Sequence, residues 1–128
     1  MQQSRTIPFP DLQGHRFMSL TTFRKNGEPI STTVWFAQED ERLYVLTAAG
    51  AGKVKRIRNN AQVEVSPCSA SGQILGISAE AMARILPGDE APHAIQVLNR
   101  KYGFQKRVYD LLHGIRGVNR AYLEIMPM

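Results

Sequence analysis

Apolar and polar positions alternate over much of this chain in short runs, a pattern typical of strands with one buried face. The residues Asn26-Gly27 separate the first two runs and favour a hairpin, because both residues tolerate a positive φ. The pattern therefore predicts six strands, of which the first three would form an antiparallel meander. The predicted strands are residues 16–24, 30–37, 43–48, 62–68, 77–86 and 120–127.

Helical spacing replaces alternation in two parts of the chain. Within "TAAGAGKVKRIRNN", residues 47–60, the apolar positions Val54, Ile57 and Ala61 recur at helical spacing and predict a short helix. A longer helix is predicted from Asp89, a plausible N-cap, to Gly103, which stands where a C′ glycine belongs. Its apolar stripe would be Ile95, Leu98 and Tyr102, and a second helical piece would cover residues 105–113.

The segment 77–86 could form either a helix or a strand. Its Ala, Glu, Met and Arg residues are good helix formers. Alternation of Ala79, Ala81 and Ala83 with Glu80 and Met82 favours the strand, which we predict. With six strands, one short helix after the third and helices before the last, the chain is predicted to be a closed or partly closed antiparallel β-barrel.

The composition fits a single domain over residues 1–128, since the length is ordinary for one and 43% of the residues are hydrophobic. The core of so small a domain is modest, so a dimer would be a natural way to bury more surface. No apolar run is long enough to span a membrane, and the first residues lack the apolar centre of a signal peptide. We therefore expect a cytoplasmic protein.

Charge gathers on the predicted short helix, in a chain whose formal net charge is +5. Three interpretations compete for these cations: a phosphate cradle, a nucleic-acid face and a merely solvated helix. Backbone N–H groups at a helix start, with cations beside them, bind phosphate well, and the hydroxyl of Thr47 could contribute. The segment is not a P-loop, since Thr47 and Val54 stand where that motif needs glycine and Ser or Thr. The cations are Lys53, Lys55, Arg56 and Arg58.

Other chemistry finds little support in the residues. Cys68 is the sole cysteine, and His15, His93 and His113 are scattered without ligand spacing, so no metal site is predicted. No GxSxG turn marks a nucleophile, and no residue is required as a catalytic acid or base. The aromatic residues lie in predicted strands, where core packing explains them, and nucleic-acid motifs are absent.

The order of these segments resembles the pyridoxamine-5′-phosphate-oxidase-like split β-barrel superfamily, and within it the flavin/deazaflavin oxidoreductases described as F420-dependent. The resemblance runs from about Phe17 to Ile125 and is most specific in "TVWF" and "TAAGAGKVKRIRNN". It implies a six-stranded split barrel of the FMN-binding type. It also implies a homodimer with two cofactor sites at the subunit interface, and a small-molecule substrate.

The resemblance also implies which residues hold the cofactor. Its phosphate would lie at the helix after the third strand, with Lys53 as the best ligand and Thr47 and Arg56 as second choices. Lys55 and Arg58 would reach the cofactor's tail. The ring would lie along the second strand, although Trp35 could equally be a core residue. The ring-binding residues are Ser31, Thr32, Thr33, Val34 and Trp35.

Two cofactors remain open on this basis. F420 carries a phosphodiester and an acidic glutamate tail, so four cations favour it, whereas FMN carries one phosphate and needs fewer. The first hypothesis is hydride transfer from reduced F420 to a small organic substrate. The second is an FMN-dependent oxidoreductase, and the third is a protein that binds a flavin or deazaflavin without turnover.

Overall fold

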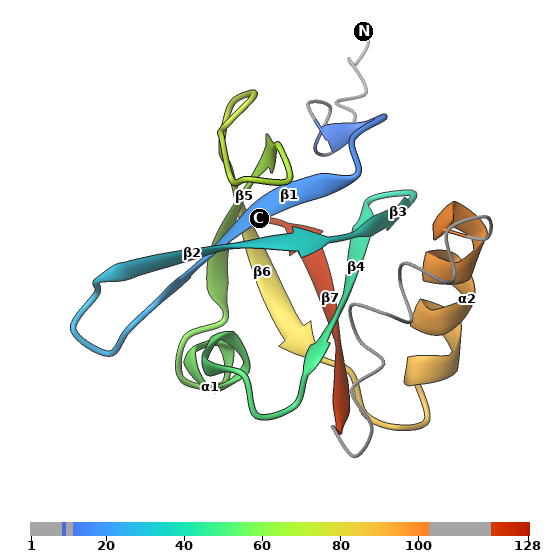
Figure 1. Ribbon diagram of the computed structural model, residues 1–128. Helices are drawn as coiled ribbons and strands as arrows, with labels where there is room; N and C mark the ends of the chain where they lie inside the picture. The colour runs from blue at the N-terminus through green and yellow to red at the C-terminus, as the bar shows by residue number, and fades with distance from the viewer. Residues whose placement is uncertain (1–8, 10–11, 103–118) are drawn as a thin grey trace, which may run out of the picture.

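A computed structural model describes residue 9, residues 12–102 and residues 119–128 of the chain. One curled antiparallel sheet of seven strands forms most of this part, in the order β2-β1-β5-β6-β7-β4-β3 (Figure 1). Two helices, α1 and α2, accompany the sheet. The strands are β1 (Phe17–Phe23), β2 (Pro29–Trp35), β3 (Ala37–Glu39), β4 (Arg42–Ala48), β5 (Gln62–Cys68), β6 (Ala79–Ile85) and β7 (Arg120–Pro127). The helices are α1 (Gly52–Asn59) and α2 (Ala91–Tyr102).

The predicted split barrel is confirmed, but with seven strands instead of six. The predicted second strand breaks at Phe36 into β2 and β3, which lie at opposite ends of the sheet order. The sheet therefore curls so that its two end strands, β2 and β3, meet on either side of Phe36. The predicted meander forms only in part, because β4 pairs with the short β3 at residues 42–44, with β7 over residues 43–48, and not with β2.

The hairpin of β1 and β2 forms as the sequence predicts. The two strands pair in register from Phe17↔Trp35 to Phe23↔Pro29, and Gly27 takes the positive φ of 89° that the turn requires. Alternation holds as well: Met18, Leu20 and Thr22 face the interior and are fully buried.

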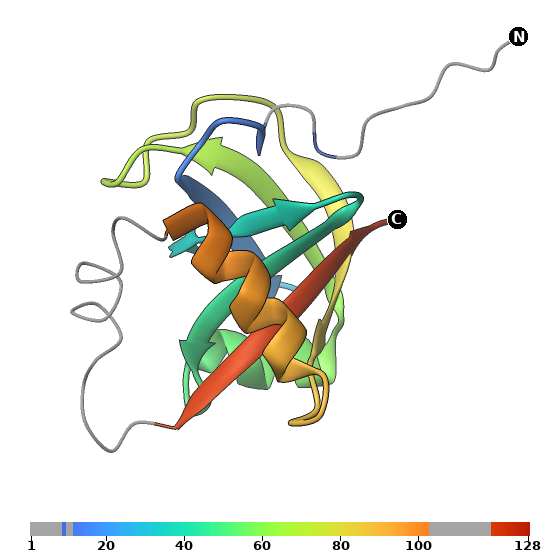
Figure 2. The same cartoon turned by 90° about the vertical axis from the view of Figure 1, so that its right-hand side faces the viewer.

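Two hydrophobic cores lie on either side of the sheet. The inner core fills the barrel with side chains of β1, β4, β5 and β7, and Ile57 of α1 covers one end of it. The outer core lies under α2, which crosses the outer surface of β4 and β7 (Figure 2). The buried positions of α2 are Ala94, Val97, Leu98 and Tyr102, whereas Ile95 is 37% exposed, so the predicted stripe was right for two of its three members.

Most remaining elements agree with the sequence. Residues 79–85 form a strand despite their helical propensity, and α1 and β7 lie where predicted. Pro67 stays within β5, but β6 pairs only with residues 62–65, so Pro67 has β1 as its strand neighbour on one side alone. Gly103 and the helical piece predicted at 105–113 lie outside the described residues.

Candidate functional site

The sheet leaves a gap between β2 and the second half of β4, which we call the split. In the described part of the chain, β2 pairs with β1 alone. β4 pairs with β3 only at residues 42–44, so residues 45–48 have no strand partner on the side facing away from β7. Backbone N–H and C=O groups along such edges are free to bond a ligand.

Helix α1 follows β4 and packs against β1 and β6 at one end of the split. Val54 and Ile57 anchor it, since both are buried in the barrel. Lys53 reaches back to β4, where its Nζ lies 3.4 Å from Thr47 Oγ1, and Arg56 Nε donates to Thr22 Oγ1 on β1 over 2.6 Å. The helix has no side-chain cap at Ala51, and the Val54 N–H bonds to the Ala51 carbonyl oxygen over 3.1 Å.

Lys53 and Arg56 form what we call the inner pair. Both are half-buried, and the hydroxyls they contact belong to buried threonines. The Arg56 guanidinium folds back onto the start of the helix, where a Cβ on Gly52 would lie only 2.8 Å from its Nη1. The two cations are close enough to repel each other. Burial first, and then Arg56, lowers the pKa of Lys53.

No acidic residue of the described chain forms an ion pair with Lys53 or Arg56. Carboxylates of the described residues pair instead with cations elsewhere, among them Arg24, Arg42, Arg84, His93 and Arg100. Half-buried cations are ordinarily neutralised by carboxylates, because an unpaired buried charge costs free energy. Two neighbouring cations held only by hydroxyls therefore form a site that an anion would stabilise. A phosphate group has the charge and the acceptor oxygens for it.

Lys55 and Arg58 form an outer pair that is separate from the inner one. Both side chains are exposed, and neither contacts the inner pair. The structure thus divides the four predicted cations between two sides of α1. Only Lys53 and Arg56 meet Thr47 or another buried hydroxyl of the barrel.

The predicted residues of β2 also divide between two faces. Ser31, Thr33 and Trp35 point outward, with Ser31 Oγ 2.7 Å from Thr21 Oγ1 and Cys68 Sγ 4.0 Å from Thr33 Oγ1. Val34 points inward and is buried, so only its backbone is available to a ligand. The Trp35 ring lies between other aromatic rings and packs on the outer core, which supports the core interpretation in part.

Thr32 is the inward-facing hydroxyl of β2. Its Oγ1 is buried without a hydrogen-bond partner, which is uncommon for a buried polar atom. Sequence reasoning missed Thr22, the acceptor for Arg56. Its signal was present, because a threonine follows Met18 and Leu20 on the apolar face of β1.

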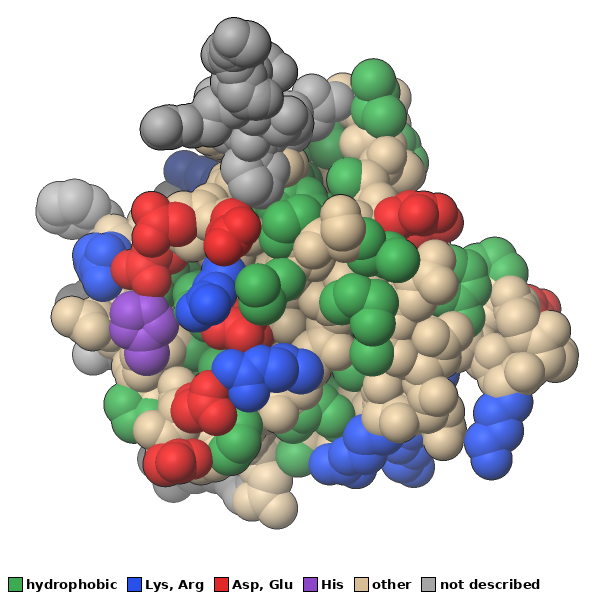
Figure 3. All heavy atoms as spheres, turned by 180° about the vertical axis from the view of Figure 1, so that it is seen from behind, with side chains coloured by type: hydrophobic (Ala, Val, Ile, Leu, Met, Phe, Trp, Pro, Cys, Tyr) green, Lys and Arg blue, Asp and Glu red, His purple; other side chains and the backbone are tan. Residues whose placement is uncertain are grey.

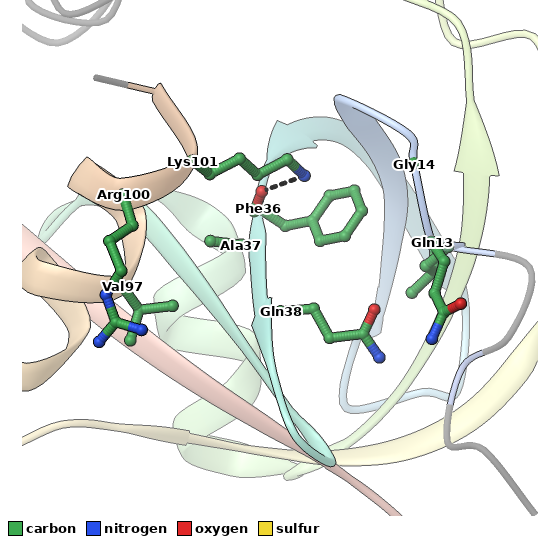
Figure 4. Close-up of a pocket in the computed structure, with 9 residues that line it drawn as sticks. Gln13, Gly14, Phe36, Ala37, Gln38, Val97, Arg100 and Lys101 are labelled. Atoms are coloured by element: carbon green, nitrogen blue, oxygen red, sulfur yellow. Dashed lines mark hydrogen bonds between the residues drawn. The ribbon is translucent and has the colours of Figure 1, made fainter.

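Two cavities lie away from the split, and no predicted site residue lines either of them. One, of about 390 Å³, lies between α2 and the segment before β1 (Figure 4). Phe36, Gln38, Val97 and Lys101 are among its lining residues. The other, of about 320 Å³, lies at the start of α2.

The smaller cavity is part of a charge network on the face shown in Figure 3, where acidic and basic side chains gather beside each other. Buried Glu124 accepts from Arg84 Nε at 2.8 Å and from the Tyr44 hydroxyl at 3.2 Å. Arg84 also pairs with Glu90 at 2.5 Å. Glu39 pairs with His93, whose hydrogen bond is the main cause of a lowered pKa for Glu39.

Metal ligands do not gather in the part of the chain that the structure describes: no three His, Cys, Asp or Glu side chains there are grouped to hold an ion. Burial raises the pKa of the Cys68 thiol, which makes it a poorer nucleophile. Among the described helices, none is long and apolar enough to cross a membrane.

The family model for pyridoxamine 5′-phosphate oxidase matches residues 10–125. The chain belongs to this family, in agreement with the resemblance seen in its sequence. No curated protein sequence matches the chain.

Solved structures share the fold at low identity. The heme storage protein HutZ from Vibrio cholerae superposes with a TM-score of 0.66 at 18% identity, covering 91% of this chain and 84% of its own. An F420 reductase gives 0.63 at 17% identity, covering 98% and 96%. An FAD-binding protein from Mesorhizobium loti gives 0.65 at 20% identity, covering 91% and 82%. These likenesses establish the split-barrel fold, which the named proteins use for different ligands.

Proposed function

We propose that the protein is an F420-dependent oxidoreductase, which transfers a hydride from the reduced deazaflavin to a small organic substrate. The observation that carries the proposal is the inner pair. Lys53 and Arg56 are half-buried, contact hydroxyls and have no carboxylate partner among the described residues. Their place at the end of the split suits the phosphate of a cofactor whose ring extends along β2.

Each residue then has a defined task. Lys53, Arg56 and Thr47 would hold the phosphate, while Lys55 and Arg58 would face an acidic tail that leaves the site. The backbone edge of β2 and the hydroxyls of Ser31, Thr32 and Thr33 would bond the polar edge of the ring, with the backbone of Val34 and the ring of Trp35 beside them. The bound cofactor supplies the redox chemistry, so the protein's part is to orient it and exclude water.

FMN is the second candidate, and one observation favours it. Only two of the four cations contact buried hydroxyls of the barrel, and a single phosphate needs no more than these. An FMN-dependent oxidoreductase would use the inner pair and leave Lys55 and Arg58 solvated.

A paired fluorescence titration with F420 and with FMN tests the proposal. Preferential binding of F420, followed by oxidation of reduced F420 in a panel of electron-accepting substrates, is the expected result. Preferential binding of FMN would instead favour the second candidate, an FMN-dependent oxidoreductase. Tight binding with no turnover would make it a cofactor carrier, and binding of neither would overturn the proposal.

We also propose that the protein is a homodimer with the cofactor at the interface. The loop after β5 exposes Ile74, Leu75 and Ile77, and Gly72 of this loop lies against Thr33 on the outer face of β2. Clustered exposed apolar side chains mark interaction surfaces. Sedimentation should give a dimer for the wild type and a monomer for the double variant Ile74→Ser/Leu75→Ser. A wild-type monomer would contradict the proposal.

A further inference from the structure

Phe36 occupies a singular position in the barrel. It lies between β2 and β3, which stand at opposite ends of the sheet, so the barrel closes across this residue. Phe36 belongs to neither strand, and its backbone polar groups must find partners outside the sheet ladders. The buried residue finds them at the last turn of α2.

The Tyr102 hydroxyl holds both backbone groups of Phe36. It donates to the Phe36 carbonyl oxygen at 2.5 Å and accepts from the Phe36 N–H at 3.1 Å. The carbonyl oxygen of Arg16, 3.0 Å away, is an alternative acceptor for the same proton. Tyr102 is buried and belongs to the last turn of α2, so a helix far along the chain fixes the strand break.

Lys101 is a second residue of α2 that bonds to Phe36. Its Nζ donates to the carbonyl oxygens of Phe36 and His15, each at 2.7 Å, and lies 3.7 Å from the centre of the Phe36 ring. Figure 4 shows the Lys101 side chain extending from α2 over Phe36, with the hydrogen bond drawn. We call Lys101, Tyr102 and their bonds to Phe36 the clamp.

The clamp also reaches the candidate cofactor strand. Trp35, the last residue of β2, lies edge-to-face against Tyr102, with ring centroids 4.8 Å apart. On its other side lies Phe17, at 5.0 Å. Movement of Tyr102 would therefore release one of the two rings that orient Trp35, as well as the backbone of the next residue.

We infer that Lys101 and Tyr102 are positioning residues that set the end of β2 and the orientation of Trp35, and thereby the affinity for the ring of the cofactor. The effect on cofactor affinity rests on the proposed function. The structural half of the inference, which is the positioning of β2 and Trp35, does not. It assigns a role to two residues that lie outside the split and to which the sequence analysis gave no part in the site.

The experiment separates the ring from the phosphate. Affinities are measured for F420 and its phosphate-free deazaflavin riboside, and for FMN and riboflavin. In Tyr102→Phe and Lys101→Met, both members of the bound pair should weaken alike, by about three- to tenfold, the scale of one or two lost hydrogen bonds. Lys53→Ala should instead weaken only the phosphorylated member.

Trp35 supplies a readout that needs no cofactor, because it is the only tryptophan in the chain. Its fluorescence and near-ultraviolet circular dichroism should change in Tyr102→Phe and Lys101→Met. They should return toward the wild type in Lys101→Arg, which restores the charge and the donors. Lys25→Met, the same change at an exposed lysine of the β1–β2 turn, is the control and should change neither signal.

The outcomes are distinct. Unchanged Trp35 spectra and ring affinity in both clamp variants would overturn the inference. If wild-type protein binds none of the four ligands, the proposed function fails, while the Trp35 spectra still decide the structural half. If Tyr102→Phe does not fold, Lys101→Met and its rescue by Lys101→Arg decide the question.

Discussion

Arginine has opposite surroundings in the inner pair and in the charge network at the start of α2. In the network, Arg84 has carboxylate partners on two sides, Glu90 and buried Glu124. At the split, Arg56 and Lys53 have hydroxyl partners and repel each other. A cation whose charge is neutralised by carboxylates holds elements of the fold together, whereas a cation with only hydroxyl partners can still bind an external anion. The contrast locates the candidate site better than the number of cations does.

The largest effect should come from removing the inner lysine. Lys53→Ala is expected to weaken cofactor binding by about 1–3 kcal/mol, the range for a charge-assisted hydrogen bond. Titration followed by fluorescence measures it. Lys25→Ala, the same change at an exposed turn lysine, should have no effect, and Lys55→Ala in the outer pair should have a smaller one. Equal losses for Lys53 and Lys55 would remove the distinction between the two pairs.

Removing the charge of Glu124, a carboxylate that already has cation partners, should affect stability and not cofactor binding. Glu124→Gln keeps the shape but removes one of the two carboxylates that pair with Arg84 and the charged acceptor of the Tyr44 hydroxyl, so the free energy of unfolding should fall by about 1–2 kcal/mol. Urea unfolding measures this loss, and cofactor affinity should stay unchanged. The control is Glu28→Gln, which breaks an exposed pair with Arg24 and should cost at most about 0.5 kcal/mol. Impaired binding in Glu124→Gln would place the network within the site.

Lys101 is a third kind of cation, held by carbonyl oxygens. Burial lowers its pKa from 10.5 to about 8. Between pH 8 and pH 10.5 the Lys101 amine keeps its proton in the unfolded chain but loses it in the folded protein. The free energy of unfolding should therefore rise as pH increases from 8 toward 10.5. Urea midpoints at pH 7.5 and 9.5 should show this rise in the wild type relative to Lys101→Met. An identical pH response in the two proteins would contradict the shift.

The smallest effect should come from Gly52. A methyl group there would meet Arg56 Nη1 at 2.8 Å, but this is the end of a flexible side chain and can move aside. Gly52→Ala should therefore lower cofactor affinity about twofold with no loss of stability, since alanine favours helix. Gly50→Ala is the control, because nothing lies within 4 Å of its Cβ position. A loss of stability in Gly52→Ala alone would show that Arg56 cannot move.

Local patterns predicted local structure well. Alternation identified β1, β6 and β7, the Asn26-Gly27 pair identified the hairpin, and helical spacing identified α1. These signals arise from neighbouring residues, so they are present in the sequence itself. The number and spacing of the strands predicted a closed or partly closed barrel, and the family resemblance identified it as a split barrel.

What the sequence could not give depends on residues far apart in the chain. Residues 30–37 form one continuous run of strand-forming residues without a Gly or Pro, so the break at Phe36 became visible only with its partners on α2. In the sequence, Glu124 alternates with the apolar residues Leu123 and Ile125, which favours an outward-facing position. It is nevertheless buried, because Arg84 and Tyr44 flank it on the neighbouring strands. For the same reason the sequence could not divide the four cations into an inner and an outer pair.

The place of β7 in the sheet has a consequence for how the protein is made. β7 is the last strand in the chain, yet it lies between β6 and β4, in the interior of the sheet order. While the chain is being synthesised, β4 and β6 must wait on the ribosome with exposed edges until β7 emerges. Barrel closure therefore waits for β7, and until β7 emerges the nascent chain presents strand edges that a chaperone can protect.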